Sequence, residues 1–412
     1  AGLAGRGGAW RVATEYVKEN LAACLTTTLL FFGLLALFSL FNRDVKMVSL
    51  VEFGGKAFAP QPAVHMMASY CKSQEIGVFY GGASLGTGEA LNQFTTFDFK
   101  SNLFEPPNGD LSALPSLMGS TLVSIDDQLE TGACRFLLTG GTSNRASDIQ
   151  NPESSQVFLI YVARTANGLK SSVSVVSVEG ERPEPRFLAA SGSIGKSLFT
   201  VGGASSLAEN ATVFDDVWRF TLSSDAVDSS PTGAWAQIDF TASEVKPIRA
   251  YGAASAMYGD STLVVYGGKT NSSPAESITT LQTKTVYDLS ILENSFKNPT
   301  STPVGSAVKV LASDEGSDLL PRFNAIMGAV PTPSASLTTL YVYGGKELIP
   351  SGGQKNNEFI SFAFANLIQG ESFCRDSDRY FAWCGVQEQY PGDSGFPVGL
   401  TRGNSLIFLG PG

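Results

Sequence analysis

A short apolar run that ends in two glycines recurs five times along the chain, and this repeat restricts the fold more than any other feature. The runs are rich in Val, Leu, Phe and Tyr, which is typical of strands buried on both faces. The glycine pairs are Gly81-Gly82, Gly140-Gly141, Gly202-Gly203, Gly267-Gly268 and Gly344-Gly345. Their spacings are 59, 62, 65 and 77 residues. A period of this length around a strand predicts a repeat architecture.

Further signals surround the glycine pairs. Glycine has no Cβ, so we expect each pair to adopt positive φ and to allow close backbone approach at a strand end. A second strand that starts with polar residues follows each pair. A proline, an arginine and an aromatic residue precede three of the pairs, with the arginines at positions Arg186, Arg249 and Arg322. We expect these arginines to donate inter-blade hydrogen bonds to backbone carbonyls, and the alternative is that they line a channel and bind an anion.

This order of signals resembles the kelch repeat over roughly residues 45–412. The third unit is the best copy, because Trp218 and Trp235 follow its glycine pair in the expected strands. The resemblance implies four-stranded blades around a central channel, an all-β propeller. Most units lack the late tryptophan and are longer than the roughly fifty residues usual for kelch, so we expect the extra length in loops.

The two ends of this region predict the blade count. Residues 396–412 look like the first two strands of a sixth blade, after which the sequence stops. Residues 47–53 form an apolar run that could supply the missing strand. We therefore predict a six-bladed kelch-like propeller closed by an N-terminal strand, an arrangement that leaves only short, protected sheet edges.

Residues 21–41 predict a membrane anchor. This run begins with Leu21, ends with Phe41 and contains no charge in 21 residues. A helix of that length spans about 31 Å, which matches the hydrocarbon core of a bilayer. We expect a single transmembrane helix, preceded in residues 1–20 by a short interfacial helix. Basic residues flank both sides of the run, so the orientation stays open.

The cysteines leave two alternatives open. Cys24 falls within the predicted span. Cys374 and Cys384 lie close together in an irregular stretch, and a disulfide between them is one hypothesis, which would imply an oxidising compartment. The other is that four thiols are reduced, with Cys134 packed as a small hydrophobe beside a core strand. That irregular stretch belongs to a long insertion, residues 346–395, which is the first choice for a partner contact.

No residue pattern predicts catalysis, a cofactor or a metal site. The string Gly392-Asp393-Ser394-Gly395 is similar to a chymotrypsin-like nucleophile loop, but a triad also needs a base, and His65 is the only histidine. One histidine and no Cys-x-x-Cys pair leave no zinc cluster. The net charge of −10 and the lack of a Lys/Arg cluster argue against a nucleic-acid partner.

The sequence therefore predicts a single-pass membrane protein with a non-catalytic binding or scaffold function. We expect an accessory subunit of a larger complex in an organellar membrane, with the mitochondrial inner membrane favoured. Its partners would be other subunits, through propeller loops, and the bilayer, through residues 21–41. A cell-surface or lumenal receptor or adhesion module is an alternative, which glycans at Asn210 or Asn271 would favour. A membrane-tethered carbohydrate-active enzyme is a further alternative.

Overall fold

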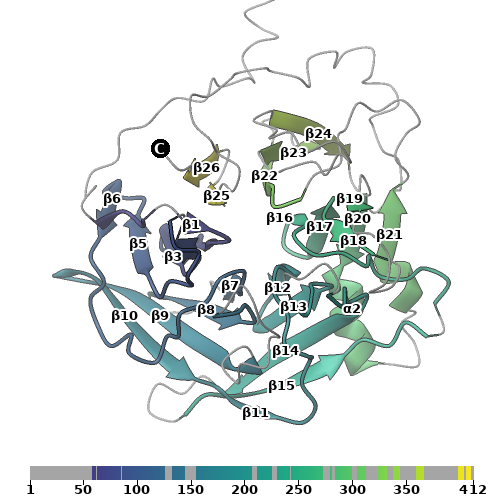
Figure 1. The fold of residues 1–412 in the computed structure, drawn as a ribbon, viewed down its shortest axis with the longest axis horizontal. Helices are drawn as coiled ribbons and strands as arrows, with labels where there is room; N and C mark the ends of the chain where they lie inside the picture. Colours follow the sequence, from purple (N-terminus) through teal and green to yellow (C-terminus); the bar gives the residue numbers. More distant parts are fainter. Residues whose placement is uncertain are drawn as a thin grey trace, which may run out of the picture. The chain divides into compact units, whose positions relative to one another are not determined.

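The computed structural model describes residues 58–409, apart from 62, 85, 126–131, 144–154, 207–210, 225–229, 242, 272–278, 281–283, 299–303, 312–322, 332–336, 344–358, 366–397 and 403–404. The chain divides into two units, Ala1–Glu52 and Phe53–Gly412, and every described residue lies in the second. This second unit consists mainly of β-strands in a β-propeller-like arrangement (Figure 1).

Four blades are complete, and each has four antiparallel strands that pair in chain order. The first contains β2 (Met67–Cys71), β3 (Ile76–Tyr80), β5 (Phe94–Asp98) and β6 (Leu103–Glu105). The second contains β7 (Thr121–Ile125), β8 (Ala133–Thr139), β9 (Val157–Thr165) and β10 (Gly168–Val175). The third contains β12 (Ala190–Ile194), β13 (Ser197–Val201), β14 (Val217–Ser224) and β15 (Thr232–Gln237). The fourth contains β16 (Ala254–Tyr258), β17 (Thr262–Tyr266), β20 (Lys284–Asp288) and β21 (Val308–Leu311).

Short elements decorate these blades. The pairs β1 (Ala63–Val64) with β4 (Ala83–Ser84), and β18 (Lys269–Thr270) with β19 (Thr279–Thr280), are two-residue ladders. Helix α2 (Leu289–Lys297) and the 3₁₀ helix η3 (Val304–Ala307) lie between the last two strands of the fourth blade.

Two further sheets follow the fourth blade. The first has three strands, β22 (Ile326–Pro331), β23 (Leu337–Tyr343) and β24 (Phe359–Ala365). The second has two, β25 (Val398–Arg402) and β26 (Ser405–Leu409). The first strands of all six sheets contact one another in chain order, and β25 also contacts β2.

The described residues thus contain four complete blades rather than the six predicted. The difference arises because the chain that would extend the last two sheets, residues 366–397 and the predicted closing strand 47–53, lies outside them. The predicted membrane span, residues 21–41, also lies outside. Within the described part of the chain, no helix is long and apolar enough to cross a bilayer.

The core lies between neighbouring sheets, and this explains the uninterrupted apolar runs. All five residues of β3 are buried. Ile76, Val78 and Tyr80 pack against the second blade, whereas Phe79 packs on the opposite face against Phe104 of its own blade. A strand with two buried faces cannot alternate apolar and polar residues. Each buried aromatic or aliphatic side chain contributes roughly 1.5–3 kcal/mol to stability.

The outer strand of the second blade passes directly into the third. β10 ends at Val175, and after Val176 the chain forms β11 (Ser177–Glu179). β11 pairs in parallel with β15, so it becomes a fifth strand at the outer edge of the third blade. Blades two and three therefore share one continuous segment at their rims.

Candidate functional site

The predicted glycine pairs lie where one blade meets the next. Every described glycine of these pairs has positive φ: Gly81, Gly82, Gly140, Gly141, Gly202, Gly203, Gly267 and Gly268. At three junctions the N–H of the second glycine donates to a carbonyl at the start of the next blade. The bonds run from Gly82 to Leu117 at 2.9 Å, from Gly141 to Arg186 at 2.8 Å and from Gly203 to Ala250 at 2.8 Å.

The first glycine of each pair provides the close approach. A Cβ on Gly81 would lie 2.3 Å from the carbonyl oxygen of Leu117, and one on Gly202 would lie 2.4 Å from that of Ala250. No side chain fits at such distances, because real Cβ contacts below 3.0 Å are essentially absent. The predicted positive φ and close backbone approach are therefore confirmed at these pairs. Gly344 and Gly345 lie outside the described residues.

A second set of backbone hydrogen bonds links five sheets just before the first strand of each. One residue two positions before each first strand has positive φ: His65, Gly119, Leu188, Gly252 and Asn324. The carbonyl of each of the first four accepts from the N–H of the next residue in this series, at 2.9, 2.8, 2.8 and 2.6 Å in chain order. His65 therefore has a structural backbone role in this series, at the place where other sheets use glycine, leucine or asparagine.

Of the three arginines that recur in the repeat, Arg186 has a clear structural role. The Arg186 guanidinium is buried, donates to the carbonyl of Gly202 at 2.9 Å, and forms a two-bond ion pair with Asp216 at 2.5 and 3.0 Å. It also lies 4.5 Å from the centre of the Phe214 ring. These contacts stabilise the glycine end of the third blade. Arg249 is partly buried, and Arg322 lies outside the described residues.

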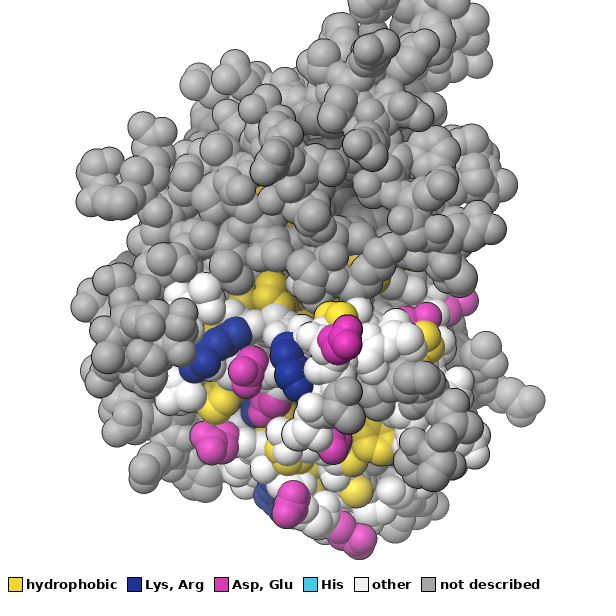
Figure 2. Space-filling view, turned by 90° about the vertical axis from the view of Figure 1, so that its right-hand side faces the viewer, with side chains coloured by type: hydrophobic (Ala, Val, Ile, Leu, Met, Phe, Trp, Pro, Cys, Tyr) yellow, Lys and Arg dark blue, Asp and Glu magenta, His cyan; other side chains and the backbone are white. Residues whose placement is uncertain are grey.

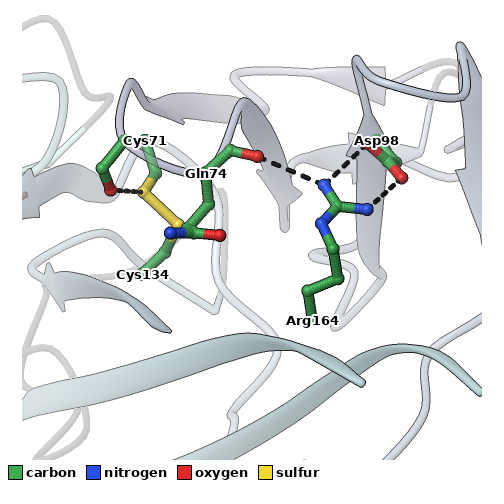
Figure 3. Close-up of a disulfide and its surroundings, with 6 residues drawn as sticks. Cys71, Gln74, Asp98, Cys134 and Arg164 are labelled. Atoms are coloured by element: carbon green, nitrogen blue, oxygen red, sulfur yellow. Dashed lines mark hydrogen bonds and ion pairs between the residues drawn. A yellow bond between two sulfur atoms is a disulfide. The ribbon is translucent and has the colours of Figure 1, made fainter. Parts of the chain in front are cut away.

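The opposite end of the first two blades is cross-linked (Figure 3). Cys71, the last residue of β2, forms a disulfide with Cys134 in β8, with their Cα atoms 5.9 Å apart. Beside it, Arg164 of β9 donates to both carboxylate oxygens of Asp98 in β5, at 2.5 and 2.9 Å, and to the carbonyl of Gln74 at 3.2 Å. Both links join the first blade to the second.

The Asp98 carboxylate is held in its charged form. Its burial alone would raise the pKa, but the Arg164 hydrogen bonds, the N–H of Lys100 and the positive charge of Arg164 lower the pKa of Asp98 to about 2. The same pairing raises the pKa of Arg164. The pair therefore stays ionised across the physiological range of pH.

Helix α2 forms at the corresponding end of the fourth blade. Asp288 ends β20 and caps the helix, because its carboxylate accepts from the N–H groups of Ser290 and Ile291 at 2.9 and 3.1 Å. Leu289 and Leu292 are buried against the core between blades three and four. This leaves the polar positions 290, 293, 294 and 297 on one helical stripe, since they follow the three- and four-residue spacing.

That polar stripe lines the best candidate for a binding site, a groove of about 340 Å³. Its other wall is the turn between β12 and β13, with Ile194, Gly195 and Lys196, together with Thr221 of β14. The complete lining is Ile194, Gly195, Lys196, Ser197, Thr221, Ser290, Glu293, Asn294 and Lys297. The groove lies at the start of β13, so it is at the opposite end of that strand from Gly202 and Gly203.

An ion pair and an aromatic contact hold the two walls together. Arg219 of β14 donates to Glu293 of α2 at 3.0 Å, and its guanidinium lies 3.7 Å from the centre of the Phe296 ring. Lys297 lies 3.8 Å from the other Glu293 oxygen while its side chain remains 65% exposed. The groove therefore combines hydroxyl and amide groups with exposed lysine, which suits a polar or acidic segment of a partner.

Charges of both signs also mix elsewhere on the surface. On the side of the molecule drawn in Figure 2, the described acidic and basic side chains are interspersed among uncharged ones. Among the residues with described placement, no three His, Cys, Asp or Glu side chains gather to hold a metal ion. Cys374, Cys384 and most of the insertion 346–395 lie outside the described residues, apart from β24 within that insertion.

Comparison with protein-family models and with curated protein sequences finds no match to this chain. The structure itself defines the class of protein as mainly β, with a β-propeller-like arrangement of blades.

Sequence reasoning missed two features of the candidate site. The first is the pairing of Cys71 with Cys134, since the two lie 63 residues apart and spacing alone does not connect them. The second is helix α2. Its signal was present, because Asp288 can cap a helix and Leu289, Leu292 and Phe296 recur at helical spacing.

Proposed function

We propose that this chain is a membrane-anchored, non-catalytic binding or scaffold protein, an accessory subunit of a larger organellar membrane complex. In this proposal residues 21–41 anchor the chain in the bilayer. Its soluble part is a six-bladed kelch-like propeller. The first strands of the six sheets contact one another in a closed series, since β25 returns to β2, and this supports a count of six blades. The sheets β22–β24 and β25–β26 would then belong to the fifth and sixth blades.

The observation that carries the proposal is the groove beside α2. The glycine ends of the blades use the same bonds at successive junctions, whereas in the ranges that the structure describes α2 is an α-helical insertion in the fourth blade alone. Insertions on a repeated scaffold gather on one face, which is commonly the binding face. The walls of this groove are fixed by Arg219 and Phe296, so a partner would meet a preformed surface and lose little entropy in ordering it.

The first test is the native size of the protein. After gentle solubilisation of source membranes, the full chain should migrate on a native gel within a particle of several hundred kilodaltons, and mass spectrometry of that band should identify defined companions. Migration as a monomer with its detergent micelle would contradict the subunit proposal.

The second test concerns the groove. Asn294→Glu adds bulk and a negative charge on the exposed stripe of α2, which would repel an acidic partner segment, and we expect it to weaken companion recovery about tenfold. Ser172→Glu on the outer strand β10 is a matched control at an exposed site away from the groove, and should leave recovery unchanged. Equal recovery in both variants would remove the groove as the contact site.

A lumenal or cell-surface receptor is the second candidate, favoured by the Cys71–Cys134 disulfide, since such bonds persist in oxidising compartments. The acceptor sequence at Asn271 gives it no support. Asn271 is 2% exposed and its side-chain amide donates to the carbonyl of Ala211 at 3.2 Å, so we expect no glycan there. Surface labelling of intact cells, with an organelle marker as control, distinguishes the two candidates.

A further inference from the structure

The Cys71–Cys134 disulfide joins two blades that are distinct in sequence. Cys71 ends the first strand of the first blade, and Cys134 lies near the start of the second strand of the next. Figure 3 shows the bond beside the Arg164–Asp98 pair, which crosses the same junction. The two links come from different pairs of strands, so the junction is fixed at two separate points.

Both sulfur-bearing residues are inaccessible in the folded protein. Cys71 is 0% exposed and Cys134 is 1% exposed. They pack in the apolar cluster between the blades, together with Ile76, Phe136 and Val162. An oxidising enzyme could not reach either thiol after the two blades have packed. The bond must therefore form before the two blades have finished packing.

We propose that this bond forms during folding in an oxidising compartment, and that the propeller domain resides there. The two thiols transfer two electrons to the disulfide of a thiol oxidoreductase and form the Cys71–Cys134 bond. The oxidoreductase leaves as a dithiol, which takes up the two protons that the cysteines release. In the cytosol the thiol pool would keep such a pair reduced during folding.

The inference sets the orientation that the flanking charges leave open. This step rests on the proposed membrane anchor at residues 21–41. If that helix crosses the bilayer once, residues 1–20 lie on the reducing side and the propeller lies on the other. A secretory lumen and a mitochondrial intermembrane space both supply the required oxidant, and fractionation separates them.

The test traps the thiols of the full chain in its native membrane. Membranes are quenched in acid, denatured in N-ethylmaleimide, and digested without reductant before mass spectrometry. We expect the peptides containing Cys71 and Cys134 to appear joined, as the main species of both. Recovery of both cysteines as maleimide adducts would overturn the inference, as would pairing of either one with a different cysteine.

Orientation has a separate readout. In sealed vesicles, an impermeant maleimide should label a Lys170→Cys variant, at an exposed position on β10, only from the oxidising side. A Cys24→Ala/Cys374→Ala/Cys384→Ala background keeps the Cys71–Cys134 bond and leaves the new cysteine as the thiol available for labelling. Labelling from the reducing side would contradict the orientation.

These outcomes are independent of the proposed subunit function. A joined peptide in a protein that migrates alone would keep the compartment inference and remove the complex. If companions are found but both cysteines are recovered as maleimide adducts, the complex is supported and the compartment inference is removed.

Discussion

The two ends of the blades are built in different ways. At the glycine end, the same N–H to carbonyl bond recurs at three successive junctions, at 2.8–2.9 Å. At the opposite end, one junction has a disulfide and an ion pair, and another has a helix with an arginine on a phenylalanine ring. The repeat in the sequence thus encodes the ring of blades, whereas the opposite end carries what is particular to this chain.

We expect the largest loss of stability from removing the disulfide at the end opposite the glycine pairs. Replacing both cysteines, Cys71→Ala/Cys134→Ala, should lower the free energy of unfolding by about 4 kcal/mol, because a bond that closes a loop of this length restricts the unfolded chain. Chemical denaturation of the purified protein measures this loss. Adding reductant to folded wild-type protein is the control and should change little, since both residues are buried. An unchanged stability in the double variant would show that the bond is redundant with the packing around it.

The next effect compares two ends of one strand. Gly202→Ala after β13 should cost about 3 kcal/mol, because φ is +63° and the new Cβ would lie 2.4 Å from the Ala250 oxygen. Gly195→Ala before β13 is the matched control, with φ of +55° and nothing within 4 Å. It should cost only about 1 kcal/mol, the strain of the backbone alone. Urea denaturation measures the free energy of unfolding of both variants. If both lose the same amount, the close approach of Gly202 to the Ala250 carbonyl does not contribute to stability.

A third effect appears on acidification. The pKa of Asp98 is lowered on folding from 3.8 to about 2, so its contribution is fully present above pH 4 and is lost as the pH falls through 2. This shift corresponds to about 2 kcal/mol of stability. Unfolding curves from pH 5 to pH 2 should show the loss in wild-type protein and a flatter profile in Asp98→Asn. The exposed Asp260→Asn serves as control, and a steep profile in Asp98→Asn would contradict the assignment.

The smallest effect concerns the helix beside the groove. Asp288→Ala removes the cap of α2 and should cost about 1 kcal/mol, because two helix N–H groups lose their acceptor. Amide hydrogen exchange should accelerate in α2 alone. Asp239→Ala, which removes a carboxylate that accepts only from Thr241 in an exposed turn, is the control. Acceleration across the whole fourth blade would show that the helix is part of the core.

Much of the ring could be predicted from local residues. The glycine pairs require positive φ wherever they occur, and the strands before them are apolar throughout because both faces are buried. Arg186 donates to a carbonyl as predicted, although the acceptor, Gly202, belongs to the same blade and the predicted bond was between blades. Each of these properties depends on a few neighbouring residues, so the sequence alone contains it.

The opposite end could not be predicted in the same way. The Cys71–Cys134 and Arg164–Asp98 contacts join residues more than sixty positions apart, and many pairings are compatible with the same spacing. Only the packing of one blade on another selects among them. The groove has the same origin, because its walls come from two blades and no single segment contains its pattern.

The continuous segment that runs from β10 of the second blade to β11 of the third affects how the molecule can associate with other molecules. The outer edge of a sheet offers unpaired N–H and C=O groups that a strand from another molecule can join. In the third blade, residues 177–179 of the chain's own β11 occupy the edge of β15. A strand from another molecule would first have to displace β11, which is covalently continuous with β10 of the second blade. The rim of the third blade is therefore protected against strand-by-strand association with other molecules.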